Sequence, residues 1–111
     1  MATSKPEVFA LRIMEHFGLA QYFDHICGAP MDNQEGAKKA AVIRDALRRA
    51  GVEDLSTAVM VGDRRHDIDG ARQAGLEAVG VLWGYGDLQE LEASHPVHIV
   101  ENFDGLKRVL I

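Results

Sequence analysis

Apolar residues follow two different periods along this chain, and the two kinds of segment alternate. Apolar positions spaced three or four residues apart predict amphipathic helices, and short continuous apolar runs predict buried strands. Glycine, proline and helix-capping residues separate these segments. Alternating strands and helices are typical of an α/β domain.

In the N-terminal half, the chain is expected to leave a strand at Met1–Ser4 and to enter a helix at Ser4. Ser4-Lys5-Pro6-Glu7 has the capping-box pattern, with proline in the first turn. The expected elements that follow are a helical face of Phe9, Ile13 and Phe17 ending at Gly18, a weak strand at His25–Cys27, a polar loop from Gly28 to Gly36, and a helix from Ala37 to Ala50 that buries Ile43, Ala46, Leu47 and Ala50.

The C-terminal half predicts a strand–helix–strand unit, with strands at Thr57–Val61 and Ala78–Trp83 and a helix at Asp67–Ala74 between them. Neither strand alternates with polar residues, which favours parallel strands covered on both faces. Asp87 and Glu90 form a second capping-box pattern that predicts a helix to about Ser94. A short strand at 97–100 and a helix from Phe103 complete the chain.

Composition narrows the class of protein. With 111 residues, 47% of them hydrophobic and 26% charged, the chain is expected to form one small domain over residues 1–111. A net charge of −5 with dispersed Lys and Arg argues against nucleic-acid binding. No apolar run is long enough to cross a membrane, and Cys27 is a single cysteine, so a cytoplasmic location is expected by default.

Two carboxylates follow the strand at 57–61. Asp63 and Asp67 lie four residues apart where the strand turns into a helix, so both can face one point. In open α/β sheets, ligands bind at the carboxyl ends of strands, and Mg²⁺ is commonly held by one or two carboxylates. The alternative is that Asp67 caps the helix and Asp63 hydrogen-bonds the turn. The motif alone leaves both interpretations open.

A candidate anion site precedes the first helix. The Thr3 hydroxyl and the amides of Ser4 and Lys5 would lie at a helix N-terminus, although capping by Ser4 alone also explains the pattern. Lys39, after the polar loop, could offset the charge of an anionic ligand. A solvent-facing lysine is the usual alternative, and the neighbouring Lys38 leaves open which of the two faces a site.

Three segments together resemble the haloacid-dehalogenase-like (HAD) phosphatases, in the order of that family's motifs. They are Thr3-Ser4-Lys5-Pro6, Lys39-Ala40-Ala41-Val42-Ile43 and Val61-Gly62-Asp63-Arg64-Arg65-His66-Asp67. The stretches Gly70–Gly75 and Val79–Gly86 also resemble the phosphoglycolate-phosphatase-like branch, so the likeness covers essentially the whole chain. The resemblance implies a Rossmann-like, three-layer parallel sheet. It also implies that Thr3 and Ser4 bind phosphate, that Lys39 stabilises the transferring group, and that Asp63 and Asp67 help to hold Mg²⁺.

One family feature is missing from the sequence. In these enzymes an Asp-x-Asp-x-Thr motif on the first strand supplies the nucleophile, and a cap domain inserted after it selects the substrate. The look-alike Asp67-Ile68-Asp69-Gly70-Ala71 follows polar residues and has alanine where the hydroxyl belongs. We therefore expect the first strand and the cap to be absent from this chain.

The resemblance accordingly predicts the C-terminal portion of a Mg²⁺-dependent phosphate-monoester hydrolase, inactive alone, whose full-length form acts on a small phosphorylated substrate. The missing strand would lie between the strands that end at Thr3 and at Asp63, and its loss would leave edges through which a homodimer could form. A non-catalytic Mg²⁺-binding, phosphate-binding or protein-interaction module is the first alternative. A different doubly wound domain with a structural Gly-Asp loop is the second.

Overall fold

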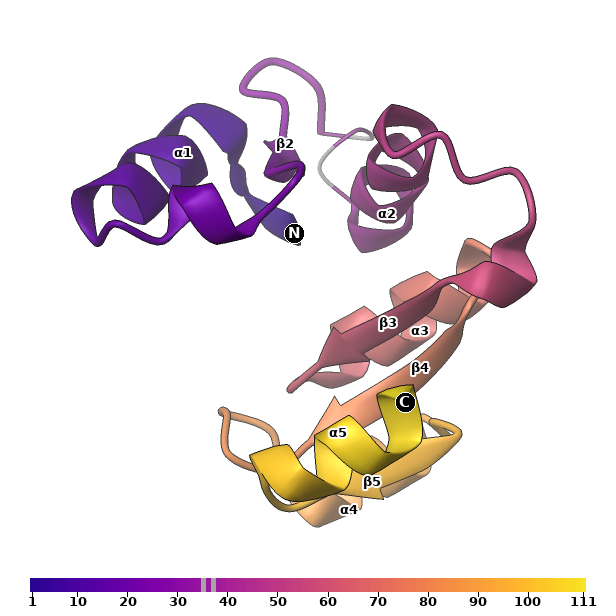
Figure 1. Cartoon of the computed structure of the whole chain (residues 1–111). Helices are drawn as coiled ribbons and strands as arrows, with labels where there is room; N and C mark the ends of the chain where they lie inside the picture. The colour runs from indigo at the N-terminus through magenta and orange to yellow at the C-terminus, as the bar shows by residue number, and fades with distance from the viewer. Residues whose placement is uncertain (35, 37) are drawn as a thin grey trace. The chain divides into compact units, whose positions relative to one another are not determined.

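The computed structural model describes residues 1–34, 36 and 38–111, and these form two compact units, Met1–Glu53 and Asp54–Ile111 (Figure 1). Both units contain parallel strands joined through helices. The predicted α/β class is therefore confirmed. Among the described residues, no helix is long and apolar enough to cross a membrane.

The first unit has a pair of parallel strands, β1 and β2, whose register joins Ala2 to Cys27 and Pro6 to Ala29. Its helix α1 and a short 3-10 turn, η1, connect these two strands, and helix α2 follows them (Figure 1). The bounds are β1 Ala2–Pro6, α1 Glu7–His16, η1 Ala20–Tyr22, β2 Cys27–Ala29 and α2 Lys39–Arg49.

The predicted helix start at Ser4 is wrong. Helix α1 begins at Glu7, its N-cap residue Pro6 makes no side-chain capping bond, and Ser4 lies within β1. A residue that precedes proline is disfavoured in the helical region of the backbone, so Lys5 remains extended. Pairing with β2 satisfies part of this extended backbone, and the strand continues to Pro6.

Helix α1 buries Ala10 and Met14 against Ile26. The face predicted from Phe9, Ile13 and Phe17 is instead exposed, with fractions of 43%, 41% and 67%. The apolar spacing predicts the helix correctly, but the face that packs inward is the adjacent one, which carries Ala10 and Met14.

Helix α2 begins at Lys39 and buries Ala40, Val42 and Ile43. Of the predicted buried stripe, Ile43 is confirmed. Ala46 and Leu47 are half-buried, and Ala50 is exposed and lies just beyond the helix. The predicted first residue, Ala37, lies outside the described residues. The inward face of α2 is thus concentrated in its first turns, where the helix packs on β1 and β2.

The second unit is a three-stranded parallel sheet in the order β3-β4-β5. The strands are β3 Val59–Gly62, β4 Glu77–Val81 and β5 His98–Val100, and the helical segments are η2 Leu55–Thr57, α3 Arg65–Gln73, α4 Leu88–Ala93 and α5 Phe103–Leu110. Positive φ angles of 70° at Gly51 and 86° at Gly75 agree with the predicted helix ends, because glycine adopts this conformation without strain.

The central strand β4 is buried from Ala78 onward, as its continuous apolar sequence predicts. The neighbouring β3 pairs only with β4 among the described strands, and Val59 is 40% exposed. The prediction that the strand at Thr57–Val61 is covered on both faces is therefore wrong for this edge strand. The apolar sequence of β3 is typical of a central strand, but among the described strands β3 has a neighbour, β4, on one side only.

We expect Leu91→Ala to lower the free energy of unfolding by about 3 kcal/mol, because Leu91 is fully buried in α4 and its removal leaves a cavity. Leu88, in the same helix, is 48% exposed and is the matched control. Leu88→Ala should change the same free energy by about 0.5 kcal/mol or less. Urea unfolding followed by circular dichroism measures both, and equal losses would contradict the packing described for α4.

Candidate functional site

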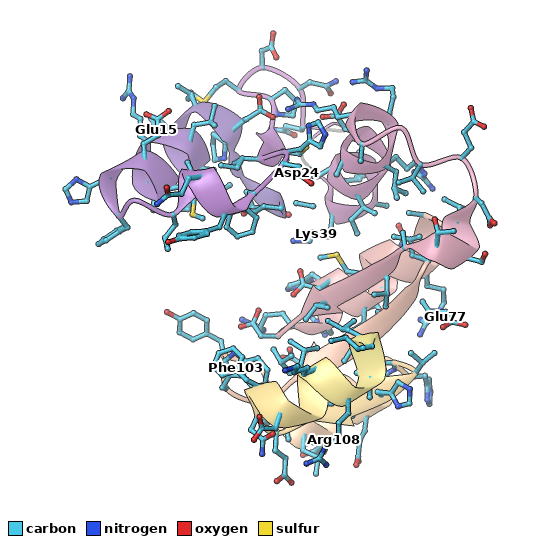
Figure 2. The ribbon with its side chains drawn as sticks, viewed as in Figure 1. Glu15, Asp24, Lys39, Glu77, Phe103 and Arg108 are labelled. Carbon is cyan, nitrogen blue, oxygen red and sulfur yellow. The ribbon has the colours of Figure 1, made fainter. Side chains whose placement is uncertain are left out.

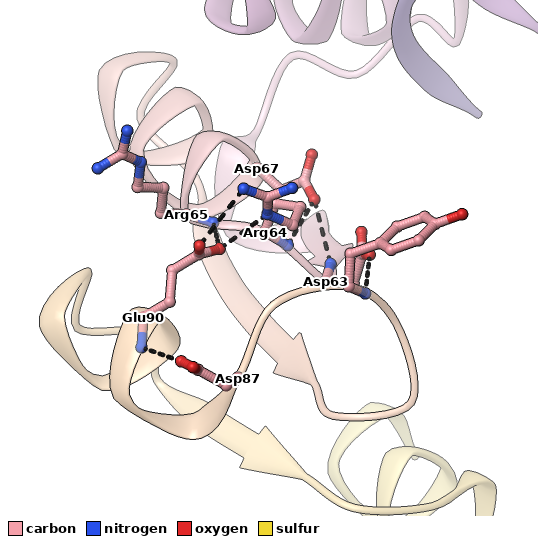
Figure 3. A network of polar contacts seen from close by, with 7 residues as sticks. Asp63, Arg64, Arg65, Asp67, Asp87 and Glu90 are labelled. Atoms are coloured by element: carbon pink, nitrogen blue, oxygen red, sulfur yellow. Dashed lines mark hydrogen bonds and ion pairs between the residues drawn. The ribbon is translucent and has the colours of Figure 1, made fainter.

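In the second unit, Asp63 and Asp67 belong to one hydrogen-bonded turn between β3 and α3. Asp67 is buried, with 8% of its surface exposed. Its Oδ2 accepts hydrogen bonds from the backbone N–H groups of Asp63, at 3.1 Å, and Arg64, at 3.2 Å (Figure 3). Asp67 thus caps the start of α3 and draws the Asp63 backbone toward its own carboxylate.

Gly62 makes this turn possible. A Cβ atom at Gly62 would lie 2.4 Å from Asp67 Oδ2 and 2.2 Å from Asp67 Cβ, far closer than such atoms approach one another. Only a residue without a side chain therefore allows the Asp67 carboxylate to reach the backbone of the turn. The Gly-Asp pair at the strand end and the aspartate four residues later form one structural unit.

The loop after β4 fixes Asp63 from the other side. Asp63 Oδ2 accepts a hydrogen bond of 2.8 Å from the Tyr85 N–H, drawn as a dashed line beside Asp63 in Figure 3. The backbone carbonyl of Asp63 accepts a further bond of 3.0 Å from the Gly86 N–H. A Cβ at Gly84 would lie 2.3 Å from Asp63 Oδ2, and one at Gly86 would lie 2.1 Å from the Asp63 carbonyl oxygen. Both glycines are required for the loop to pass this close to Asp63.

Glu90 of α4 contacts the same turn at Arg64 and Arg65. Its Oε2 accepts hydrogen bonds from Arg64 Nε, at 2.9 Å, and from the backbone N–H of Arg65, at 3.0 Å (Figure 3). The Arg64 guanidinium and the Arg65 amide together hold the pKa of Glu90 below its usual range, and Glu90 in turn raises the pKa of Arg64. The N–H of Glu90 donates to Asp87 Oδ1 at 2.8 Å, which confirms the predicted cap of α4.

The chemistry of this turn fits Mg²⁺ without forming a closed cage. It offers two carboxylates, and no cluster of three or more His, Cys, Asp or Glu side chains suited to a metal occurs among the described residues. Mg²⁺ is usually bound through one or two carboxylates while water and substrate phosphate fill its other positions. The capping bond of Asp67 and the Tyr85 bond of Asp63 are also the contacts of the structural alternative, and they orient the carboxylates in either case.

In the first unit, the structure brings Lys39 next to the strand that carries Thr3. Lys39 Nζ donates a hydrogen bond of 2.9 Å to the carbonyl of Ala2, and Lys39 is half-buried, whereas Lys38 is exposed. The Thr3 hydroxyl accepts a bond of 3.2 Å from the Lys5 N–H. Lys39 is therefore held against β1.

Ser4 and Lys5 do not occupy the predicted position at a helix N-terminus, because α1 begins at Glu7. Ser4 is exposed on β1. The expected helix N-terminus at Ser4 is therefore not formed, and Thr3 and Ser4 lie on β1, whose Ala2 carbonyl accepts the hydrogen bond from Lys39.

The sequence patterns did not identify two features of the second unit. They are the contacts of Gly84-Tyr85-Gly86 with Asp63 and those of Glu90 with Arg64 and Arg65, whereas the capping-box pattern predicts for Glu90 only a place at the start of a helix. A signal was present, since two glycines around an aromatic residue directly after a buried strand indicate close backbone approach at the carboxyl edge of a sheet.

Comparison with known proteins identifies the family. A family model described as HAD-hydrolase-like matches residues 35–106, which is more than half of the sequence. The chain belongs to the HAD-hydrolase-like family.

Relatives and solved structures agree with this assignment. A 5'-nucleotidase of Pseudomonas aeruginosa is 37% identical over 99% of the chain and 49% of its own length. A phosphoglycolate phosphatase of Neisseria meningitidis is 38% identical over 88% of the chain and 42% of its own length. The crystal structure of a putative phosphatase from Clostridium difficile matches with a TM-score of 0.90 at 42% identity, covering 99% of the chain and 51% of that structure.

These matches confirm the HAD fold and the likeness to phosphoglycolate phosphatases. The chain spans about half the length of the relatives it matches. The parallel α/β arrangement observed here is thus part of a Rossmann-like HAD core.

The Glu90 contacts predict a pH-dependent stability. Because the folded-state pKa of Glu90 is lowered, its contribution is fully present above the ordinary glutamate value of 4.5 and is lost as the pH falls through the lowered value. Glu90→Gln should therefore lower the thermal midpoint at pH 7, and the gap to the unmodified protein should narrow by pH 3.

Glu92, exposed in the same helix, supplies the control. Glu92→Gln should leave the midpoint close to that of the unmodified protein at both pH values. Thermal unfolding followed by circular dichroism measures all three proteins, and a gap for Glu90→Gln that is constant with pH would contradict the ion pair with Arg64.

Proposed function

We propose that this chain is part of a Mg²⁺-dependent hydrolase of small phosphate monoesters. The observation that carries the proposal is the turn after β3, where Gly62 allows Asp67, in the first turn of α3, to hold the backbone of Asp63, so that both carboxylates lie where β3 meets α3. Family membership and relatives named 5'-nucleotidase and phosphoglycolate phosphatase support phosphate esters as the substrate class.

In this proposal Asp63 and Asp67 provide oxygen ligands for Mg²⁺. When bound, the ion would neutralise charge on the phosphate oxygens. The protein's own part is to orient these carboxylates in advance. The amides of Arg64 and Tyr85 each donate to one of them, which fixes their positions before any ligand arrives.

Thr3, Ser4 and Lys39 would bind the phosphate itself. The hydroxyl groups of Thr3 and Ser4 lie on β1, and Lys39 Nζ is hydrogen-bonded to Ala2, one residue before Thr3. A lysine ammonium held against this strand could donate to phosphate oxygens and offset their charge as phosphoryl transfer proceeds.

The carboxylate nucleophile of the family is not part of these 111 residues, because no Asp-x-Asp-x-Thr motif occurs in the sequence. The residues present can position and neutralise a phosphate, but covalent transfer needs an attacking group as well. We therefore propose that hydrolysis requires further sequence and that these residues alone are inactive.

A non-catalytic binding module remains the second candidate. It is favoured by the hydrogen bonds of Asp63 and Asp67 to backbone amides, because these contacts serve the structure of the turn whether or not a metal binds. Such a module would bind Mg²⁺ or phosphate with the same residues and hydrolyse nothing.

We further propose that the open side of β3 accepts another strand. Among the described strands β3 pairs only with β4, and Val59 is 40% exposed on it. Apolar edge strands pair readily with other chains or segments. The strand would come from the remainder of the full-length protein or from a second copy of this chain.

Lys39 and Lys38 form a matched pair for testing the phosphate role. In the protein at its native length, Lys39→Met should lower kcat for hydrolysis of an aryl phosphate about 100-fold or more, because a cation that stabilises the transition state is lost. Lys38→Met removes a neighbouring exposed charge and should change kcat less than about threefold. Equal losses in both variants would contradict the assignment of Lys39.

Asp63→Asn tests the metal role and separates the two candidate functions. An enzyme at native length should lose about 100-fold or more of its activity with Mg²⁺ in this variant, since one charged ligand is lost.

In the binding module, hydrolysis is absent from the start, but a Mg²⁺ titration followed by NMR should shift the signals of Asp63 and Asp67. Hydrolysis by these 111 residues alone that Asp63→Asn abolishes would overturn the proposal of incompleteness, and absence of shifts would overturn Mg²⁺ binding here.

A further inference from the structure

Tyr85 combines a fixed backbone with a freely accessible ring. Its N–H donates to Asp63 Oδ2 at 2.8 Å, and the N–H of the next residue, Gly86, donates to the Asp63 carbonyl. The side chain is nevertheless 93% exposed. Since the ring contributes little to the core, its presence beside a proposed metal ligand is not explained by packing.

A pair of aromatic rings is formed by Trp83, which like Tyr85 follows strand β4, and by Phe103 of α5. The rings of Trp83 and Phe103 contact each other, with centroids 4.7 Å apart and planes inclined by 43°. Their exposed fractions are 42% and 73%, so the contact orients both rings and leaves much of their surface accessible. Figure 2 labels Phe103 at the beginning of α5.

Sheet topology places these rings and the acidic turn at one edge. Strands β3, β4 and β5 are parallel neighbours, and Asp63, Trp83 and Phe103 follow their respective carboxyl ends. This is the edge at which open α/β sheets bind ligands. The three aromatic residues Trp83, Tyr85 and Phe103, here called the aromatic cluster, therefore follow the same edge of the sheet as the proposed metal ligand Asp63, which accepts the Tyr85 N–H.

We propose that the aromatic cluster binds a planar aromatic group carried by the phosphate monoester, such as a nucleobase or a phenyl ring. This inference rests on the proposed function and specifies its substrate class. Aromatic faces recognise planar rings by stacking, largely independently of the ring's hydrogen-bonding groups. The phosphate would lie toward Asp63 and the aromatic group over Tyr85 and the pair formed by Trp83 and Phe103.

A purely structural role for the pair makes a different prediction. If Trp83 and Phe103 only fasten the start of α5 to the end of β4, substitutions there change stability without changing which phosphate esters bind. Tyr85 makes no such ring contact among the described residues and has little surface buried, so its substitution tests recognition separately from folding.

Trp83 is the only tryptophan in the sequence, which makes its fluorescence a local probe. We would titrate the protein at native length, with Mg²⁺ present, with adenosine 5'-monophosphate, phenyl phosphate, ribose 5-phosphate and inorganic phosphate. The two aromatic esters should quench Trp83 fluorescence and bind about tenfold or more tightly than ribose 5-phosphate. Trp83→Phe should abolish the quenching and thereby identify the reporter, and the ranking of the two aromatic esters distinguishes a nucleobase site from a phenyl site.

Tyr85→Ala should reduce the ratio of affinities for adenosine 5'-monophosphate and ribose 5-phosphate about tenfold, measured by isothermal titration calorimetry. Tyr22→Ala is the matched control, because Tyr22 is 75% exposed in the first unit and outside the cluster, and it should leave this ratio unchanged. Equal affinities for aromatic and aliphatic esters, or an unchanged ratio in Tyr85→Ala, would overturn the inference.

Hydrolysis assays on the same ligands distinguish failure of this inference from failure of the proposed function. Equal kcat/KM values for the aromatic and aliphatic esters, unaffected by Tyr85→Ala, would reject the aromatic site and leave the phosphatase proposal standing. Tyr85-dependent binding of aromatic esters, none of which is hydrolysed, would reject the phosphatase proposal and support the ring-binding site.

Discussion

The second unit depends on one contact, the acceptance of backbone N–H groups by the carboxylate of Asp67 at the start of α3. Asp67 is buried, and a carboxylate in that position is stable only if its oxygens receive hydrogen bonds. The amides of Asp63 and Arg64 provide them. Because a Cβ at Gly62 would overlap the Asp67 side chain, the glycine, the strand end and the cap are all parts of the same constraint.

This constraint extends outward through a few close contacts. Once the turn is formed, Asp63 presents both its carboxylate and its carbonyl to the loop at residues 84–86, which can approach because two of its three residues are glycines. Glu90 then holds Arg64 and the Arg65 amide from the side of α4. Contacts from α3, α4 and the loop after β4 thus converge on the turn at residues 63–65, and a carboxylate held in such a turn needs little rearrangement to bind a ligand.

Local chemistry decided which parts of this arrangement the sequence could predict. The capping residue Asp87, the buried strand β4 and the glycine at position 75 were all predicted, because each depends on its immediate neighbours. The pairing of Asp63 with Asp67 was predicted for the same reason. The start of α1 was not, because Ser4 has a favourable capping sequence but lies in β1, which pairs with β2 on either side of it, at Ala2 and Pro6.

Burial was harder to predict, because it depends on neighbours that are distant in sequence. The apolar spacing of α1 is equally consistent with the face of Phe9 and the face of Ala10, and the structure buries the smaller residue. Likewise, the contact between Tyr85 and Asp63 joins residues 22 positions apart, so the glycines at 84 and 86 indicate a close backbone approach but do not identify Asp63 as its partner. Long-range backbone contacts at the carboxyl edge of the sheet are therefore the part of the candidate site that only the structure shows.

The two aspartates contribute differently to the structure of the turn. Asp67 is buried and accepts two amides, so its replacement would leave donors unsatisfied and disturb the turn as well as any ligand. Asp63 is half-buried, and its carboxylate receives the single N–H of Tyr85 from the β4 loop. An isosteric amide can still accept that bond, so a change at Asp63 alters charge with less effect on the fold. Asp67 therefore contributes more to the structure of the turn, and a substitution at Asp63 changes its charge with less disturbance of that turn.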